Sequence, residues 1–291
     1  MAYNLFDLTL MIARQLGATR EGVATTNATA TQLIDTVDLA SYENDFFNGG
    51  TVWCTYDAGG ASASPEGKFA VVSDFATTTG VATITPTTTD AITAGDRYAI
   101  ATSEFSLGQM ISAINAAFAE LGYMVKEDTT TITIAEDKTE YSLPSDCYEL
   151  RQVWVQTNDD TNDNQWSQVH GWSVKKSTIG TADIVILPYQ YDADDDCRLI
   201  YLAKHPSLNV YTDKLNEWID PRLIIWPAIT SLLTFKYNTT KRDEYLNAWN
   251  KAFSISENYK RELSRHIPKK PGIRMAISQE SNRWPGDPDL R

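Results

Sequence analysis

Two short runs of acidic residues are the parts of this sequence best suited to binding a cation. Clustered carboxylate oxygens are the ligands that Ca²⁺ prefers in proteins. Neither run has the loop glycine and the distal glutamate of an EF-hand, so we interpret both as solvated hairpin tips and expect no metal site. The residues concerned are Asp192, Asp194, Asp195 and Asp196 in one run and Asp159, Asp160, Asn162 and Asp163 in the other.

Three histidines are the natural candidates for acid–base chemistry, but they lie far apart in the chain. They are His170, His205 and His266. No GxSxG motif offers a nucleophile, and neither a P-loop nor a glycine-rich dinucleotide motif follows a run of strand-forming residues. We therefore predict a protein that is not an enzyme and that uses no cofactor.

The cysteines Cys54, Cys147 and Cys197 are odd in number and widely spaced, without a CxxC pair or a nearby histidine. This pattern indicates neither a disulfide framework nor a zinc site, and we expect buried free thiols. The first apolar stretch, residues 5–16, is short and contains Asp7 and Arg14, so we expect neither a signal peptide nor a membrane span. The protein should remain in a reducing cytoplasm.

Composition and charge describe a folded acidic body with a basic end. The chain has 291 residues, of which 42% are hydrophobic and 22% charged, enough for one large domain or two ordinary ones. Its formal charge of −13 argues against a nucleic-acid-binding surface over the whole molecule. Residues 236–291 hold twelve Lys and Arg against seven Asp and Glu, a balance of +5 that leaves −18 for residues 1–235. An acidic body with a mildly basic arm could pair with complementary surfaces, or repel DNA that must slide past it.

A predicted helical hairpin near the C-terminus organises the rest of the chain. Asp220 is placed as an N-cap and Pro221 as the first residue of a helix that extends to about Phe235. Thr240 and Asp243 resemble a capping box for a second helix, whose inner stripe includes Tyr245, Trp249, Ala252 and Phe253. The turn between them is short, so the two helices should be antiparallel neighbours.

Two further helices are expected in the first half of the chain. Residues 3–16 carry apolar side chains on one side, and Ser106 with Gln109 forms a capping box for a helix that Gly122 ends. Between these helices the sequence is rich in Thr, Ala, Gly and Val. Short strand-like runs separated by turns predict a small β-barrel or sandwich there. These runs lie near residues 32–36, 51–56, 68–75, 80–85 and 97–101.

The predicted fold class is α+β: a four-helix bundle with an antiparallel β-sheet domain, an inserted small β-barrel or sandwich, and an extended C-terminal arm. We expect the sheet domain to begin with a strand at residues 130–135. The parts are 1–18 and 104–128 as helices of the bundle, 19–103 as the inserted β domain, 129–204 as the antiparallel β domain, 205–266 as the helical hairpin, and 267–291 as the arm.

Three stretches of this sequence carry a family resemblance. They are residues 105–122, the Thr-Glu-Tyr-Ser-Leu-Pro run at 139–144, and the Arg-Leu-Ile-Tyr-Leu-Ala-Lys-His-Pro run at 198–206. Together they resemble the head-to-tail connector, or adaptor, ring proteins of the tailed-bacteriophage neck. The resemblance covers residues 1–17 and 104–266. It implies a structural virion protein that forms a homo-dodecameric ring under the portal, joins capsid to tail and continues the DNA channel.

The same resemblance implies the partners of the protein. They are the portal protein and the tail or stopper and nozzle proteins, while genomic DNA passes through without sequence-specific binding and no membrane is involved. The arm would order on docking to the portal, with Trp284 as its apolar anchor and Arg274 and Arg283 as polar clamps. The full set of predicted portal-docking residues is Lys269, Lys270, Arg274, Arg283, Trp284 and Arg291.

Residues 19–103 depart from the compact form of that family, which leaves a second hypothesis open. The protein could be a virion decoration protein, or a host-surface or carbohydrate-binding protein that acts through the inserted β domain. Eight tryptophans are compatible with stacking on sugars. However, Trp53 and Trp154 alternate with polar residues as core positions do, and Trp218, Trp226 and Trp249 fall in or beside the helical hairpin. An enzyme built from distant side chains is the third alternative.

Overall fold

The structure is a computed structural model in which residues 3–60, 65–85, 90–156, 166–177, 182–191, 195–217 and 219–263 are described. These residues form two compact units. The first, which we call the helical unit, contains residues 3–124 and 204–263, and the second, the β unit, contains residues 125–203. The described residues include four α-helices and antiparallel sheets, which confirms the predicted α+β class.

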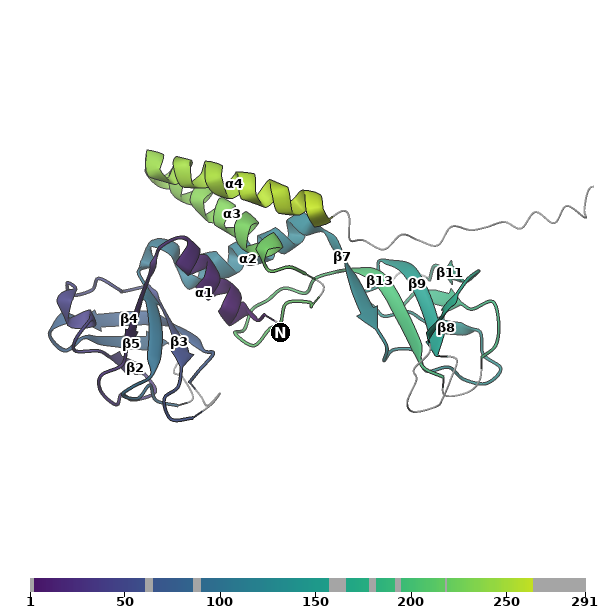
Figure 1. The fold of residues 1–291 in the computed structure, drawn as a ribbon, viewed down its shortest axis with the longest axis horizontal. Helices are drawn as coiled ribbons and strands as arrows, with labels where there is room; N and C mark the ends of the chain where they lie inside the picture. Colours follow the sequence, from purple (N-terminus) through teal and green to yellow (C-terminus); the bar gives the residue numbers. More distant parts are fainter. Residues whose placement is uncertain are drawn as a thin grey trace, which may run out of the picture. The chain divides into compact units, whose positions relative to one another are not determined.

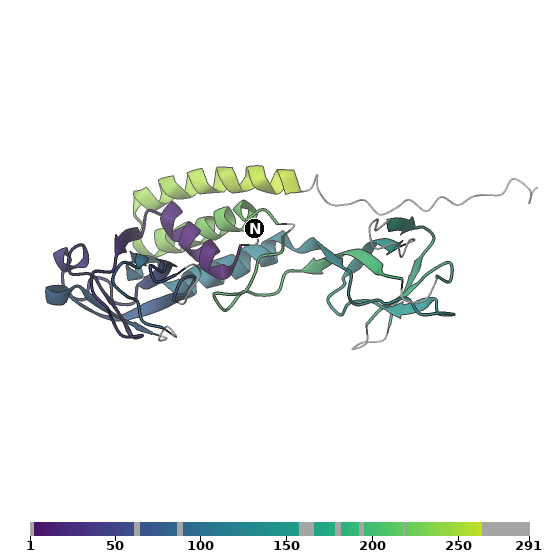
Figure 2. The ribbon, with the colours of Figure 1, turned by 60° about the horizontal axis from the view of Figure 1, so that its bottom comes forward.

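All four α-helices belong to the helical unit (Figure 1). They are α1 (Leu5–Gln15), α2 (Leu107–Leu121), α3 (Arg222–Thr240) and α4 (Asp243–Leu263), and short 3₁₀ turns are η1 (Leu39–Ser41), η2 (Thr77–Thr79) and η3 (Ser103–Phe105). α3 packs against both α2 and α4, and α1 packs against α2 and α3. Figures 1 and 2 both show α3 and α4 side by side. The four helices share one apolar core, but their arrangement as a bundle stays a prediction.

Capping side chains fix where the first two helices begin. Asn4 accepts a hydrogen bond from the Asp7 N–H at 2.9 Å, and the Asp7 carboxylate accepts one from the Asn4 N–H at 3.1 Å. Ser106 and Gln109 form the same reciprocal pair before α2, as the sequence predicts. These bonds satisfy backbone donors that have no partner within the helix.

The helical hairpin differs from expectation at its turn. α3 continues through Thr240, whose hydroxyl donates to the Lys236 carbonyl at 2.8 Å, so the predicted capping box of Thr240 and Asp243 is wrong. Lys241 then takes a left-handed conformation with φ of +57° and ends the helix. At the other end Pro221, not Asp220, occupies the N-cap position, although the Asp220 carboxylate still accepts the Arg222 N–H at 2.9 Å.

The inserted segment forms one six-stranded antiparallel sheet with the order β1-β6-β3-β4-β5-β2. Its strands are β1 (Thr19–Val23), β2 (Gln32–Ile34), β3 (Thr51–Tyr56), β4 (Phe69–Ala76), β5 (Val81–Thr85) and β6 (Arg97–Ala101). Five of them match the runs expected from the sequence. The sequence pattern does not predict β1, because its residues Thr-Arg-Glu-Gly-Val do not alternate between apolar and polar. A closed barrel and a two-sheet sandwich both stay unconfirmed.

A buried hydrogen bond joins this sheet to the helices. The indole N–H of Trp53 on β3 donates to the Thr9 hydroxyl on α1 at 3.0 Å, and both side chains are fully buried. The Thr9 hydroxyl lies 3.0 Å from the carbonyls of Leu5 and Phe6, to which it donates its own hydrogen. Trp53 also packs in the helical core together with Ala99 and Ala101 of β6. The inserted sheet is therefore part of the helical unit.

The β unit contains two small sheets. One has the order β10-β9-β13-β7 and the other β11-β12-β8. The strands are β7 (Tyr123–Asp128), β8 (Glu140–Ser142), β9 (Glu149–Gln156), β10 (Trp166–Val169), β11 (Ser173–Lys175), β12 (Ile184–Ile186) and β13 (Cys197–Lys204). The strand expected at 130–135 is absent: these described residues contain only an isolated bridge at Thr133, and the sequence reading missed β7 just before them.

Replacing Thr9 by valine tests the bond between sheet and helix. Thr9→Val keeps the shape of the side chain but removes the acceptor for the Trp53 N–H. Because a buried donor then lacks a partner, the free energy of unfolding should fall by about 1–3 kcal/mol. In a double-mutant cycle with Trp53→Phe, measured by urea denaturation, the two effects should be less than additive, since the second change removes the stranded donor. Strictly additive effects would contradict this assignment.

Candidate interaction surfaces

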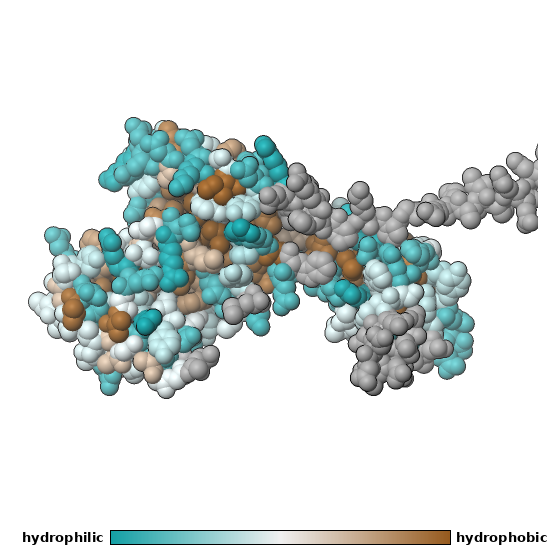
Figure 3. Space-filling view, viewed as in Figure 1, coloured by the Kyte–Doolittle hydropathy of each residue, from teal (hydrophilic) through white to brown (hydrophobic). Residues whose placement is uncertain are grey.

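A shallow groove runs over α3 between α2 and α4 in the helical unit. It consists of two hollows of about 490 and 550 Å³ that share Ser231 and Phe235. We call the two hollows together the helical groove. Its apolar lining includes Ala113, Phe235, Trp249 and Phe253. Figure 3 shows apolar side chains at the surface among hydrophilic ones over the helical part of the molecule. Such a surface is suited to contact with another protein.

Two aromatic side chains of the groove are unusually open to solvent. Phe235 is 51% exposed and Phe253 44% exposed, so Phe253 does not lie on the inner stripe of α4 as the sequence suggests. Trp249 stacks on Phe253 with ring centroids 5.0 Å apart. The rim is closed at one point by an ion pair between Lys260 and Glu120 at 3.2 Å.

Two threonine hydroxyls of the groove are already hydrogen-bonded within their own helix. Thr230 donates to the Trp226 carbonyl at 2.9 Å and Thr234 to the Thr230 carbonyl at 2.8 Å. A partner could therefore cover these hydroxyls without leaving a donor unpaired, which is the usual cost of burying polar groups.

A second apolar surface lies on the inserted domain, in the loops around η1. Tyr42 and Phe46 stack with ring centroids 5.0 Å apart, and Val37 nearby in the chain is 70% exposed. We call Val37, Tyr42 and Phe46 the aromatic tip. Its base is the buried Phe47, which makes edge contacts with both rings of the tip and with Phe75 of the sheet core.

Hydrogen bonds hold the loop of the aromatic tip in place. The Thr77 hydroxyl donates to the Tyr42 carbonyl at 2.7 Å. Asp45 has φ of +64°, its N–H donates to the Phe75 carbonyl at 3.1 Å, and its carboxylate accepts from the Asn48 amide at 2.7 Å. A loop fixed in this way loses little conformational entropy when a partner binds.

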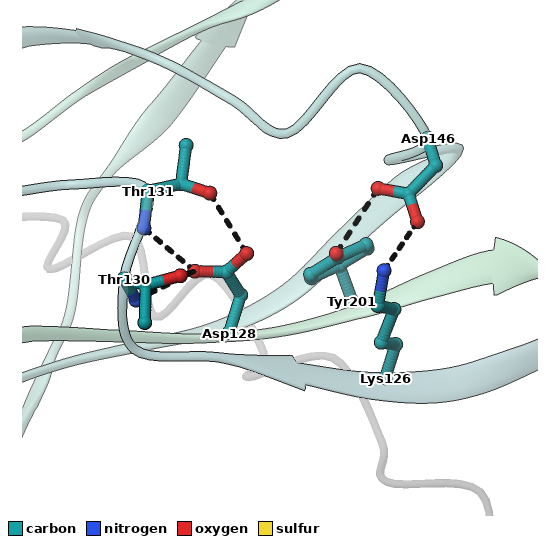
Figure 4. Close-up of polar contacts among 6 residues, drawn as sticks. All are labelled: Lys126, Asp128, Thr130, Thr131, Asp146 and Tyr201. Atoms are coloured by element: carbon teal, nitrogen blue, oxygen red, sulfur yellow. Dashed lines mark hydrogen bonds and ion pairs between the residues drawn. The ribbon is translucent and has the colours of Figure 1, made fainter. Parts of the chain in front are cut away.

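In the β unit, a polar cluster fixes the loop after β7 (Figure 4). The Asp128 carboxylate accepts hydrogen bonds from the backbone N–H groups of Thr130 and Thr131, both at 2.8 Å, and from both hydroxyls. Partial burial raises the pKa of Asp128, but these donors outweigh it and the net pKa is lowered. The threonines thus turn around Asp128 and do not continue as a strand.

The neighbouring part of the cluster ties β7 and β13 to the loop at residue 146. Tyr201 donates its phenol O–H to Asp146 at 3.1 Å, and Lys126 pairs with the same carboxylate at 2.6 Å (Figure 4). Burial, and then the charge of Asp146, raises the pKa of Tyr201 well above its usual range. The phenol remains protonated as a donor, which suits a structural role and not that of a base.

The three cysteines are free thiols that resist ionisation. Burial raises the pKa of Cys54, Cys147 and Cys197 to about 12 each, with nearby carboxylates adding to the effect. Cys54 and Cys197 are buried as expected, while Cys147 is half-buried. Because the thiolate is the nucleophile and the metal ligand, the raised pKa values disfavour reaction of these thiols near neutral pH.

Of the described histidines, one makes a packing contact and the other is exposed. His205 stacks on Phe118 with ring centroids 4.1 Å apart, and its Nε2 accepts the Asn216 N–H at 3.1 Å, so its role is in packing. His170 is exposed. Within the described residues, no group of three His, Cys, Asp or Glu side chains could hold a metal ion.

Several predicted site residues lie outside the described part of the chain. They are His266, Trp218, Asp192, Asp194, the run at 159–163, and the whole predicted docking set of Lys269, Lys270, Arg274, Arg283, Trp284 and Arg291. Asp195 and Asp196 are described, and their carbonyls accept backbone hydrogen bonds from Ile134 and Gln156. Of the described tryptophans, Trp53 is fully buried and the others are partly buried, including Trp226 and Trp249 against the helical core.

Comparison with known protein families identifies the family of this chain. The family model described as SU10 adaptor protein matches residues 70–270, more than half of the chain. The chain belongs to the SU10 adaptor protein family. It is thus a bacteriophage head–tail adaptor, a structural protein of the virion. A search of curated proteins found no match.

Only one of the adaptor's two apolar surfaces lies within the range that the family model matches. The helical groove, formed by residues between Ser106 and Lys260, lies within the matched range, whereas the aromatic tip at residues 37–46 precedes it. Sequence reasoning missed both surfaces. The aromatic tip had a weak sequence signal, three aromatic residues within six positions of a turn-rich segment. The helical groove had no such signal, because helical periodicity does not tell which aromatic side chains a neighbouring helix covers. None of the described helices of the adaptor is long and apolar enough to cross a membrane.

Replacing Asp128 by alanine tests the cluster of the β unit. The loop loses an acceptor comparable to a helix cap, so the free energy of unfolding at pH 7 should fall by about 1 kcal/mol. The lowered pKa of Asp128 gives a stabilisation that is present above the ordinary carboxyl pKa of about 4 and lost as pH falls through the folded value. Thermal unfolding should therefore separate the two proteins at pH 7 and much less at pH 3. A difference that grows in acid would contradict the assignment.

Proposed function

We propose that this adaptor is one subunit of a homo-dodecameric ring beneath the portal, which joins the capsid to the tail and continues the DNA channel. The observation that carries the proposal is the family match over residues 70–270, which spans the β unit and the helices α2, α3 and α4. A ring subunit needs surfaces for protein contact and no catalytic centre. The helical groove and the aromatic tip are surfaces of that kind.

The negative net charge of the chain favours a channel to which DNA does not adhere. A formal charge of −13 repels the phosphates of DNA, so genomic DNA would pass without sequence-specific binding. The partners in this proposal are the portal protein above the ring and tail or stopper and nozzle proteins below it. The basic C-terminal segment, residues 267–291, would dock to the portal.

Imaging of purified virions tests the placement. Cryo-electron microscopy masked on the tail vertex, with several symmetries imposed, should show twelve copies between portal and tail. Density only on the capsid surface, with the inserted domain projecting outward, would favour a decoration or host-attachment protein. Absence of the adaptor from the tail vertex would contradict the ring proposal.

The docking role of the arm has a separate test. Removing residues 268–291 should leave a helical protein that no longer co-sediments with purified portal. In the full chain, Trp284→Ala should weaken portal binding by about 2 kcal/mol or more, roughly thirtyfold, if the indole is the anchor. Tyr189→Ala, which alters an exposed aromatic residue of the β unit, is the matched control and should bind normally. Equal binding by the truncated and full-length proteins would move the docking site elsewhere.

A further inference from the structure

A ring of identical subunits requires two different contact surfaces on each copy. Head-to-tail contacts that close into a ring are heterologous: one patch meets a different patch of the next copy. The helical groove and the aromatic tip are two such patches, formed by different elements of the same unit. This inference rests on the proposed ring.

One patch is a hollow and the other is an exposed loop, and both are apolar. The helical groove has Phe235 and Phe253 at its surface, and the hydroxyls of Thr230 and Thr234 are paired within α3. The aromatic tip carries Phe46, 45% exposed, on a loop tied to the sheet core through Phe47 and Phe75. Exposed aromatic side chains that fill pockets are the residues that most often anchor protein interfaces.

The charges around the two patches are opposite. The three helices that line the groove, α2, α3 and α4 (residues 107–121 and 222–263), hold seven Lys and Arg against five Asp and Glu, a balance of +2. Residues 19–103 hold three Lys and Arg against ten Asp and Glu, a balance of −7. The acidic side chains Asp38, Glu43 and Asp45 are exposed beside the aromatic tip. Opposite charges steer two surfaces together and disfavour contact between two like surfaces.

We propose that the aromatic tip of one adaptor docks in the helical groove of the next copy around the ring. The occupant of the groove is thus a second copy of this chain. The groove belongs to the part of the chain that matches the family, and the tip to the part before it. The inserted domain would then serve the ring itself as a lateral clamp.

Cysteine cross-linking in assembled particles tests this pairing. Glu43 beside the tip and Ser231 in the groove are both exposed, so Glu43→Cys and Ser231→Cys place reactive thiols on the two surfaces. Phage that carry only the native cysteines, of which Cys54 and Cys197 are buried and Cys147 is half-buried, give the background. In phage that carry both substitutions, a short bis-maleimide should produce a ladder of adaptor multimers that ends at the closed ring. Each single variant should give no ladder.

The outcomes separate this inference from the proposed function. If the adaptor is present at the tail vertex but the double variant gives no ladder, the pairing is wrong while the ring stands. Dimers from Ser231→Cys alone would show groove facing groove and would also overturn the pairing. If the adaptor is absent from the tail vertex, the ring proposal fails and the pairing falls with it.

A pair of substitutions gives a second, independent readout. Phe46→Ser should lower the number of adaptor copies per particle at least tenfold, because it removes the phenyl group at the centre of the proposed contact. Tyr56→Ser is the matched control: Tyr56 is 48% exposed on the same domain, outside the aromatic tip, and its loss should leave incorporation unchanged. Equal incorporation of the two variants would count against the pairing. Circular dichroism and thermal unfolding verify that both variants fold.

Discussion

The buried bond between the Trp53 indole and the Thr9 hydroxyl determines how the helical unit is put together. Besides this bond, the inserted sheet is connected to the helices through its chain ends, through apolar contacts and through the exposed ion pair of Arg14 on α1 with Glu21 on β1. Because the indole and the hydroxyl are both removed from water, separating the sheet from α1 would strand an N–H and open the packing around a large aromatic side chain. The sheet and the helices are thereby held as one body, and the surfaces that each presents keep a fixed relation to one another.

Polar side chains in this adaptor are used mainly to shape the chain. Asp128 folds a loop, Asp146 receives Tyr201 and Lys126, and the hydroxyls of α3 return to their own helix. Among the described residues, the carboxylates of Asp128 and Asp146 are occupied by hydrogen bonds, and burial keeps the three thiols protonated.

The acidic body has two consequences for a protein of the phage neck. It disfavours adhesion of DNA, and it makes any basic segment a preferred place for contact with another copy or another protein. In this chain the basic residues gather in α3, α4 and the C-terminal segment. In the proposed ring, charge would separate the surfaces that avoid nucleic acid from those that meet protein partners.

The sequence by itself determined the elements and the family resemblance, because capping boxes, helical periodicity and turn residues act over a few positions. It located α2 through Ser106 and Gln109, and it identified five of the six inserted strands. It missed one local signal, the turn in which the Asp128 carboxylate accepts the N–H groups of Thr130 and Thr131, and therefore predicted a strand where the chain turns. Only the tertiary structure decided that Phe235 and Phe253 face solvent while Trp53 reaches α1, since exposure depends on which neighbours cover a side chain and not on its place in a repeat.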